Sequence, residues 1–266
     1  MRIARYSAGD GAAFGLVEGE LDDPTTLTVR RIDGHPFAPF QVVGEPQPVS
    51  GVRLVSPVLP SKVVGVGRNY LEHVAEMGGD DSAADPPVVF LKPSTSVIGP
   101  GEPVQYPTGV STEVHYEGEL AVVIGRLCRE VPAARAADVV LGYTCANDVT
   151  ARDLQLAEKQ WGRAKGFDTF CPIGPWIETD PASPLAADLA VTTTVNGELR
   201  QAGRTSQMTR GVADLIAHVS QAMTLLPGDV ILTGTPAGVG PLEVGDEVAV
   251  SIEGIGTLTN TVVPRG

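Results

Sequence analysis

The chain has 266 residues, enough for one large domain or for a main domain with a small appendage. Its composition is 42% hydrophobic and 19% charged, as in ordinary globular proteins, and its formal net charge is −13. This negative charge argues against a general nucleic-acid binder and against docking on anionic lipid, since both need a basic face. An anionic substrate stays possible, because a bound cation can invert the local field.

The three cysteines, Cys128, Cys145 and Cys171, form no CxxC pair and have no histidine at zinc-site spacing. Such a sparse, odd set is typical of a reducing compartment. The first fifteen residues lack the apolar core of a signal peptide, and no stretch approaches the roughly 20 apolar residues of a membrane span. We therefore expect a cytoplasmic protein that binds neither membrane nor nucleic acid.

The N-terminal part reads as a small β module. Two short β-like pieces, 3–6 and 13–17, are separated by a Gly-Asp-Gly turn, and a loose stretch rich in proline and glycine follows at 34–51. We predict a small N-terminal module over 1–55 and a catalytic domain over 56–266.

Strand signals dominate the main domain. Short apolar runs that end in glycine are typical of buried strands, and Asn196-Gly197 between two β-like pieces is a strong hairpin signal. The predicted strands are 62–66, 119–124, 139–144, 192–195, 198–200, 230–233, 248–252 and 257–263.

Helices are predicted at three places. Thr150 to Asp153 resembles a capping box that opens a helix to about Trp161. Apolar residues at helical spacing predict a second helix over 212–223, which Pro227-Gly228 would stop. A short helix over 70–77 would end at Gly78-Gly79, and the polar segment 80–85 after it is expected to be flexible.

Three carboxylates are candidates for a metal site. Glu117 and Glu119 lie two apart at the start of an apolar strand, so both project to one face, where a cation would relieve their repulsion. Asp148 follows another buried strand and precedes Thr150, in a position to point into a cleft. Three oxygen ligands suit Mg²⁺ or Mn²⁺. The alternatives are an exposed acidic strand edge and an Asp148 that caps the helix.

His73 and Glu76 share one face of the predicted helix 70–77, within hydrogen-bonding reach. A carboxylate beside an imidazole fixes its tautomer and raises its basicity, as a general base requires. The alternative is an exposed pair on a solvated turn.

Two further features offer anion contacts. Lys165 lies among small residues and could hold a substrate carboxylate or oxyanion, although surface lysines are commoner. The glycine-rich run 233–240 offers backbone N–H groups. It lacks the ending of a phosphate-binding P-loop, so it does not indicate a nucleotide site, and it could simply be a tight turn.

These features occur together in one order, which resembles the fumarylacetoacetate hydrolase superfamily over about residues 60–265. The blocks that carry the resemblance are Gly67-Arg68-Asn69-Tyr70 with His73 and Glu76, Phe90-Leu91-Lys92-Pro93, Tyr116-Glu117-Gly118-Glu119-Leu120, 147–153, Lys165-Gly166-Phe167-Asp168, and 233–240.

The resemblance implies a β-rich α+β fold, namely the family's mixed β-sandwich roll with a small N-terminal module, and usually a homodimer. It implies Mg²⁺ or Mn²⁺ held by Glu117, Glu119 and Asp148. It also implies that Lys165, His73 and Glu76 are catalytic, with His73 and Glu76 on a lid that becomes ordered when substrate binds. The further substrate contacts that it implies are Arg68, Asn69, Gln207 and Thr235. Arg210 stands where an apolar or aromatic residue is expected.

The implied function is metal-dependent chemistry on a small anionic 2-oxo or enolic acid, in aromatic catabolism. The pair of His73 and Glu76 favours C–C bond hydrolysis of an acylpyruvate. The alternatives are isomerisation of 2-hydroxyhepta-2,4-diene-1,7-dioate (or 5-carboxymethyl-2-hydroxymuconate) and decarboxylation of oxaloacetate. Readings from other classes are a non-catalytic protein that binds metal and a small acid, and a cupin-like or sugar-binding β protein.

Overall fold

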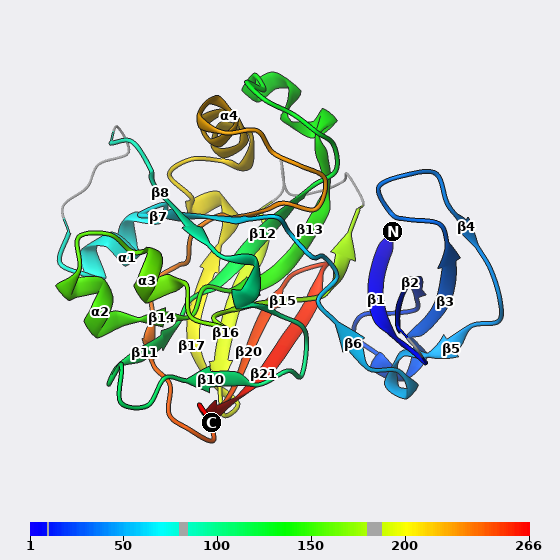
Figure 1. Ribbon diagram of the computed structural model, residues 1–266, viewed down its shortest axis with the longest axis horizontal. Helices are drawn as coiled ribbons and strands as arrows, with labels where there is room; N and C mark the ends of the chain where they lie inside the picture. The colour runs from blue at the N-terminus through cyan, green and yellow to red at the C-terminus, as the bar shows by residue number, and fades with distance from the viewer. Residues whose placement is uncertain (10, 80–84, 180–187) are drawn as a thin grey trace.

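Strands in three sheets dominate the protein, and the helices are short (Figure 1). The structure is a computed structural model that describes residues 1–9, 11–79, 85–179 and 188–266. The predicted β-rich α+β class is therefore confirmed. The segment expected to be flexible, 80–85, lies outside the described residues except for Asp85. Within the described part, no helix is long and apolar enough to cross a bilayer.

The largest sheet has thirteen strands and runs through both parts of the chain, with the main order β4-β3-β2-β1-β15-β13-β12-β18-β7-β8. It is mixed, because β18 and β7 are parallel whereas most neighbours are antiparallel. Its strands are β1 Arg2–Ala8, β2 Gly11–Glu18, β3 Thr28–Asp33, β4 Gln41–Val42, β5 Gln47–Pro48, β6 Leu54–Val55, β7 Val63–Gly67, β8 Val88–Lys92, β9 Val97–Ile98, β12 Gly118–Ile124, β13 Val140–Asn147, β15 Cys171–Glu178 and β18 Val230–Leu232.

Two smaller sheets complete the main body. One has the order β10-β21-β20-β16-β17 and the other β14-β11-β19. Asn196 and Gly197 both have positive φ and join β16 to β17, so the predicted hairpin is confirmed. The strands are β10 Val104–Tyr106, β16 Ala190–Val195, β17 Glu198–Arg204, β20 Glu247–Ile252 and β21 Gly256–Pro264, and β11 Val114–Tyr116, β14 Thr150–Ala151 and β19 Gly240–Pro241.

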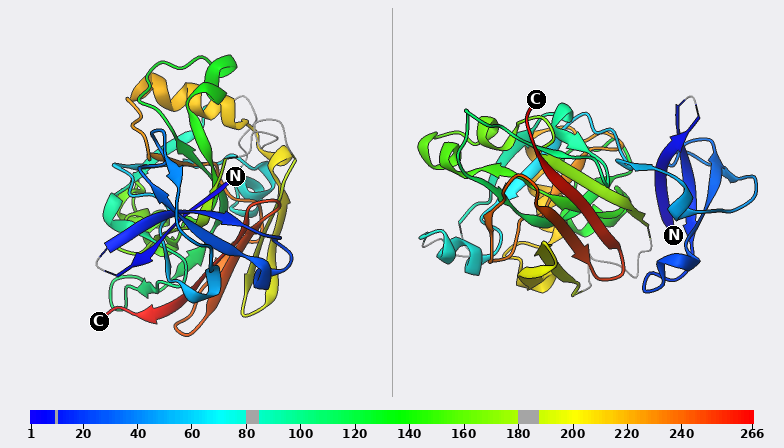
Figure 2. Two further views of the ribbon diagram at one scale, coloured as in Figure 1. Left: turned by 90° about the vertical axis from the view of Figure 1, so that its right-hand side faces the viewer. Right: turned by 90° about the horizontal axis from the view of Figure 1, so that it is seen from below.

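The N-terminal strands lie at one end of the molecule, beside the body formed by the rest (Figures 1 and 2). β1 and β2, which contain the two predicted β-like pieces, pair as an antiparallel hairpin. β1 also pairs with β15, where Ile3 lies opposite Ile177, and so joins the N-terminal strands to the main sheet.

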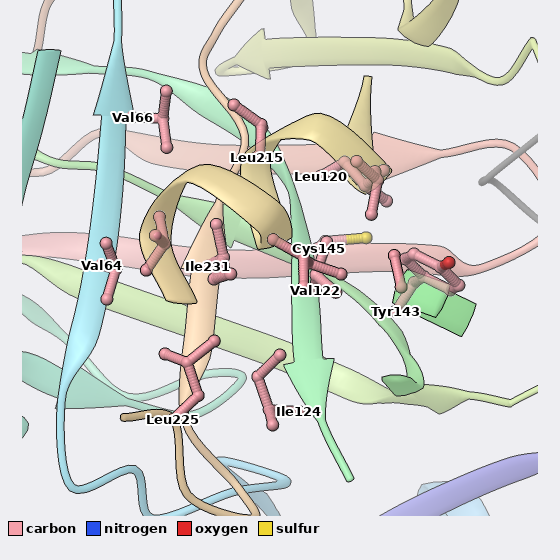
Figure 3. Close-up of a cluster of buried hydrophobic side chains, with 14 of the residues drawn as sticks. Val64, Val66, Leu120, Val122, Ile124, Tyr143, Cys145, Leu215, Leu225 and Ile231 are labelled. Carbon is pink, nitrogen blue, oxygen red and sulfur yellow. The ribbon is translucent and has the colours of Figure 1, made fainter. Parts of the chain in front are cut away.

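The strand β12 lies at the centre of the core, and its position explains its apolar sequence. Leu120, Val122 and Ile124 face one hydrophobic cluster, shared with the helix α4 (Val212–Ala222) and the sheet of β16 and β20 (Figure 3). Ala121 and Val123 face a second cluster on the opposite side. Because both faces are buried, the strand is continuously apolar rather than alternating.

The helices are α1 Leu71–Glu76, α2 Arg152–Ala157, α3 Gly162–Lys165 and α4 Val212–Ala222, with 3₁₀ turns at 24–26, 49–51, 94–96, 133–138 and 205–207. The predictions over 70–77 and 212–223 are confirmed. The single helix predicted from Thr150 to Trp161 is wrong. Thr150 lies in β14, paired with His115 of β11, and the helical stretch is broken between α2 and α3. Pairing with a distant strand has overridden the local capping pattern.

A buried carboxylate, that of Asp229, ties the start of β18 to its neighbours. It accepts hydrogen bonds from the Ser61 hydroxyl at 2.7 Å and the Leu226 N–H at 2.8 Å, and it pairs with the Lys62 ammonium. Burial alone would raise the pKa of Asp229. The contacts from Lys62, Leu226 and Ser61 outweigh it and lower that pKa.

We predict that Asp229→Asn lowers the free energy of unfolding at pH 7 by about 1–3 kcal/mol, because buried donors lose a charged acceptor. A lowered native pKa stabilises the fold above the unfolded value of about 3.9, and this stabilisation is lost as the pH falls through the native value. Urea unfolding should therefore show a gap between wild type and variant that is full at pH 7 and shrinks below about pH 4. A gap that does not change with pH would contradict this role of the Asp229 charge.

Candidate metal centre and substrate cavity

Three carboxylates meet where two central strands end. Glu117 immediately precedes β12, Glu119 lies in it, and Asp148 immediately follows β13. The two strands are antiparallel, with Gly118 opposite Asn147, so the three residues share one end of the pair. One oxygen from each carboxylate lies within 4.8 Å of those of the other two, and each residue is at most 4% exposed.

Three buried cations surround this carboxylate cluster. The Lys165 ammonium donates to Glu117 Oε2 at 2.7 Å and to Asp148 Oδ2 at 2.6 Å. The Lys92 ammonium pairs with the other oxygen of Asp148, and Arg152 Nη2 donates to Glu117 Oε1 at 2.5 Å. Glu117 and Asp148 are thus each held by two cations, which offsets the cost of burying them.

Glu119 differs from its two neighbours. Its carboxylate accepts the Gly234 N–H at 2.6 Å, whereas the three cations form their ion pairs with Glu117 and Asp148. Burial, then the charges of Asp148 and Glu117, raise the pKa of Glu119 well above its usual value. For Glu117 burial acts in the same direction, but Lys165 and then Arg152 outweigh it and lower the pKa. A further positive charge beside Glu119 would relieve this repulsion.

The donor set fits a hard divalent cation. All three candidate ligands are carboxylates, which suit Mg²⁺ or Mn²⁺ and leave coordination positions for water and substrate. The backbone between them is constrained as well. The Gly118 N–H donates to Gln201 Oε1 at 2.9 Å, and a Cβ on Gly118 would lie 2.1 Å from Thr193 Oγ1. Only glycine fits between the two glutamates without displacing buried neighbours.

The predicted contact between His73 and Glu76 forms on α1, and His73 lines the cavity beside the carboxylate cluster. His73 Nδ1 lies 3.1 Å from Glu76 Oε2, and the two side chains are 13% and 33% exposed. Glu76 also accepts the Gly238 N–H at 3.0 Å, which ties α1 to the glycine-rich run 233–240. The contact fixes which imidazole nitrogen faces the carboxylate.

A cavity of about 240 Å³ joins these groups, a size that suits a small organic acid. Polar groups lie at its floor, and apolar side chains from α1, α2 and the 158–161 turn form a wall. The lining residues are Val66, Gly67, Arg68, His73, Val74, Met77, Gly79, Glu117, Glu119, Asp148, Arg152, Gln155, Leu156, Trp161, Lys165, Gly234 and Thr235.

The predicted substrate contacts fall into two groups. Arg68 and Thr235 line the cavity. Asn69 does not; its side chain donates to Thr233 O at 2.8 Å and accepts the Arg210 N–H at 2.9 Å, so it braces the backbone. Gln207 lies in a separate hollow behind α1, where its oxygen accepts the Arg204 N–H.

The unexpected residue Arg210 lies away from the cavity. Its guanidinium donates to the carbonyl of Asp85, so its charge serves a local backbone contact rather than the substrate pocket.

Four site residues were missed in the sequence. Lys92 was visible within the Phe-Leu-Lys-Pro block but had no assigned role. Arg152 was attributed to a helix start, and Gln155 fell inside the same predicted helix without a role. Nothing in the sequence indicated a role for Trp161. It borders the cavity, and its ring lies 6.0 Å from the Lys165 ammonium, which is 4.9 Å from the ring of Phe90.

Comparison with known proteins agrees with this geometry. Residues 62–263 match the family model described as fumarylacetoacetate (FAA) hydrolase C-terminal. The chain belongs to the fumarylacetoacetate hydrolase family. Residues 1–57 match a second model, described as Rv2993c-like, N-terminal. The superfamily resemblance of the sequence blocks is thereby confirmed.

Among relatives of this hydrolase-family chain, Protein Rv2993c of Mycobacterium tuberculosis is 55% identical over 100% of this chain and 99% of its own length. Oxaloacetate tautomerase YisK of Bacillus subtilis is 42% identical over 81% of this chain and 74% of its own.

Two solved structures are informative neighbours. The 2-hydroxyhepta-2,4-diene-1,7-dioate isomerase from Mycobacterium marinum is 52% identical with a TM-score of 0.91, covering 100% of this chain and 99% of that one. The fumarylpyruvate hydrolase from Pseudomonas aeruginosa, in complex with Mn²⁺ and pyruvate, is 35% identical with a TM-score of 0.72, covering 77% and 90%.

We predict opposite stability effects for two glutamates in the metal-free protein. Glu119→Gln removes a repelled charge and keeps an acceptor for Gly234, so at pH 7 the free energy of unfolding in EDTA should stay the same or rise. Glu117→Gln leaves Lys165 and Arg152 facing a neutral amide, and should cost about 3–5 kcal/mol.

Both variants lose a carboxylate of the cluster, so calorimetric titration with Mg²⁺ should show affinity reduced by at least about 100-fold in each. Denaturant unfolding and titration together separate charge balance from metal binding. If Glu119→Gln binds Mg²⁺ as wild type does, Glu119 is not a ligand.

Proposed function

We propose that this protein is a metal-dependent enzyme that moves a proton on a small 2-oxo or enolic dicarboxylic acid, as a tautomerase or isomerase. Relatives at 42% and 52% identity carry the names oxaloacetate tautomerase and 2-hydroxyhepta-2,4-diene-1,7-dioate isomerase. The observation that carries the proposal is one cavity that joins an oriented histidine, three clustered carboxylates and a buried lysine.

The charges of the cavity support a dianionic substrate. Lys92, Lys165 and Arg152 offset the three carboxylates, and Arg68 adds a fourth positive group at the wall. A divalent cation would make the region strongly positive. A small acid with two negative charges would offset most of this local excess, even in a protein with a net charge of −13.

Glu117, Glu119 and Asp148 would hold the cation, which when bound supplies Lewis-acid polarisation of a 2-oxo group. The chain's own residues do the rest. Arg152 offers N–H donors to the substrate's oxygens, and Lys165 offers one to the negative charge that develops when a proton leaves the adjacent carbon.

His73 is the proposed base. An ionised Glu76 carboxylate can only accept a hydrogen bond. The imidazole therefore donates through Nδ1 and keeps a lone pair on Nε2 for the substrate proton. Returning that proton to a different atom completes a tautomerisation or an allylic isomerisation. The apolar wall that includes Met77, Leu156 and Trp161 limits water at this step.

Hydrolysis of an acylpyruvate is the second candidate. The fumarylpyruvate hydrolase similar to this chain favours it, as does the pair of His73 and Glu76. The same base would then take a proton from water, and the hydroxide would attack the distal carbonyl. The C–C bond would break to give a carboxylic acid and the enolate of pyruvate, which takes up the proton. Decarboxylation of oxaloacetate needs no base, so it is less well supported by an oriented histidine.

We predict that, with Mg²⁺, wild type turns over at least one of oxaloacetate (enol to keto form), 2-hydroxyhepta-2,4-diene-1,7-dioate and an acylpyruvate. His73→Ala should lower kcat on that substrate by about 10²–10⁴-fold, because a positioned base contributes that much. His218→Ala, an exposed change on α4, is the matched control.

The reaction class is read from the product, by absorbance for tautomers and by chromatography for cleavage. No turnover of any of the three acids would refute the enzymatic proposal, and undiminished kcat in His73→Ala would refute the base.

A binding experiment separates an enzyme of this kind from a protein that holds metal alone. We predict that Mg²⁺ and oxalate, an enolate mimic, raise the melting temperature together by more than the sum of their separate effects, since each completes the other's site. Lys165→Met should remove most of the joint effect. Stabilisation by Mg²⁺ alone, with nothing added by oxalate, would count against a substrate bound beside the cation.

A further inference from the structure

A relay of three side chains lies behind the cavity, formed by the buried His115 and Arg152 and the 48% exposed side chain of Glu113. Of the three, only Arg152 has been given a role so far. It starts at Glu113, passes through His115 of β11 and reaches Arg152 at the start of α2. His115 Nε2 lies 2.8 Å from Glu113 Oε1, and Arg152 Nε donates to His115 Nδ1 at 3.4 Å. His115 is 8% exposed and Arg152 is 3% exposed.

The geometry fixes the tautomer of His115. Arginine has only N–H donors, so His115 Nδ1 must present its lone pair to Arg152. The proton then sits on Nε2 and is donated to the Glu113 carboxylate. Arg152 can only donate to the ring and the Glu113 carboxylate can only accept from it, so the ring has a single orientation.

The relay also fixes the orientation of the Arg152 guanidinium. Its Nη2 donates to Glu117 at 2.5 Å, its Nη1 to the side chain of Gln155, and its Nε to His115. These contacts with described residues use three of the five N–H donors that arginine carries. The two left over belong to Nη1 and Nη2 of a residue that lines the cavity.

The backbone supports the same arrangement from both sides. His115 pairs with Thr150 of β14, and the Arg152 N–H donates to the carbonyl of Glu113 at 2.7 Å. The strand that carries the histidine is therefore joined directly to the residue that begins α2. Glu117 has further contacts with Lys165 and Thr150, so it does not depend on Arg152 alone.

We propose that His115 is a positioning residue. Its Nε2 is held by Glu113, and its Nδ1 holds the Arg152 guanidinium in the one orientation that serves both Glu117 and the substrate. This inference rests on the proposed function, because it assigns Arg152 to the binding of a small anionic acid. His115 itself does not line the cavity and touches no substrate.

The test compares three replacements of His115 in the full-length, Mg²⁺-loaded enzyme. His115→Asn places an amide oxygen near the position of Nδ1, His115→Gln places its amide near Nε2, and His115→Ala removes both. We expect His115→Ala and His115→Gln to raise KM for the 2-oxo acid by roughly 10-fold, with kcat within about twofold, as for loss of a charge-assisted ground-state contact.

His115→Asn should restore KM to within about threefold of wild type, and His218→Asn should change nothing. The Mg²⁺ concentration for half-activation should stay within about threefold in all variants, because Lys165 and Thr150 still hold Glu117. A KM in His115→Ala equal to that of wild type would overturn the proposal. So would a His115→Asn variant as impaired as His115→Ala.

A second measurement does not depend on turnover. Long-range ¹H–¹⁵N correlation spectra of the wild-type protein should show His115 protonated at Nε2 and not at Nδ1, and Arg152→Gln should alter this signature. Protonation at Nδ1 overturns the relay even if no variant folds well enough for kinetics. If the relay is seen but wild type turns over none of the three acids, the proposed function fails and the contact itself stands.

Discussion

The structure depends on three negative charges being forced together inside the protein. Glu117, Glu119 and Asp148 lie within reach of a single ion, almost wholly removed from water. Such a cluster is tolerated only because Lys92, Lys165 and Arg152 lie against it. The balance is uneven, since these cations contact Glu117 and Asp148 and leave Glu119 the most destabilised charge. The electrostatics therefore point to the place where a further cation is accepted most readily.

Much of the fold was predictable where local pattern and tertiary environment agree. The apolar run of β12 predicted burial on both faces, and Asn196-Gly197 predicted the hairpin. The prediction failed at 150–161, where Thr150 has the chemistry of a helix cap but lies in a strand paired with β11. Its hydroxyl instead lies within hydrogen-bonding distance of both the Asp148 carbonyl and the Glu117 carboxylate. A local capping pattern carries no information about a partner strand that lies 35 residues earlier in the chain.

The site was predictable in its acids and less so in its supports. Carboxylates two apart on a strand must share a face, so Glu117 and Glu119 follow from periodicity alone. No such rule says which lysine or arginine will meet them, because Lys92, Arg152 and Lys165 come from three different elements. Asn69 and Gln207 show the converse difficulty. Both sit in blocks of family-like sequence, yet their side chains serve the backbone, which residue type does not reveal.

The position of the acids on the central strands divides the site into a part that resists change and a part that tolerates it. Substitutions around β12 and β13 disturb hydrophobic clusters on both faces of the sheet. The walls of the cavity belong instead to α1, α2 and the turn before α3, which are short and lie at the surface. New substrate preferences can therefore arise by drift in these peripheral segments while the carboxylate cluster stays intact. A family built in this way can include catalysts of unlike reactions without redesigning its interior.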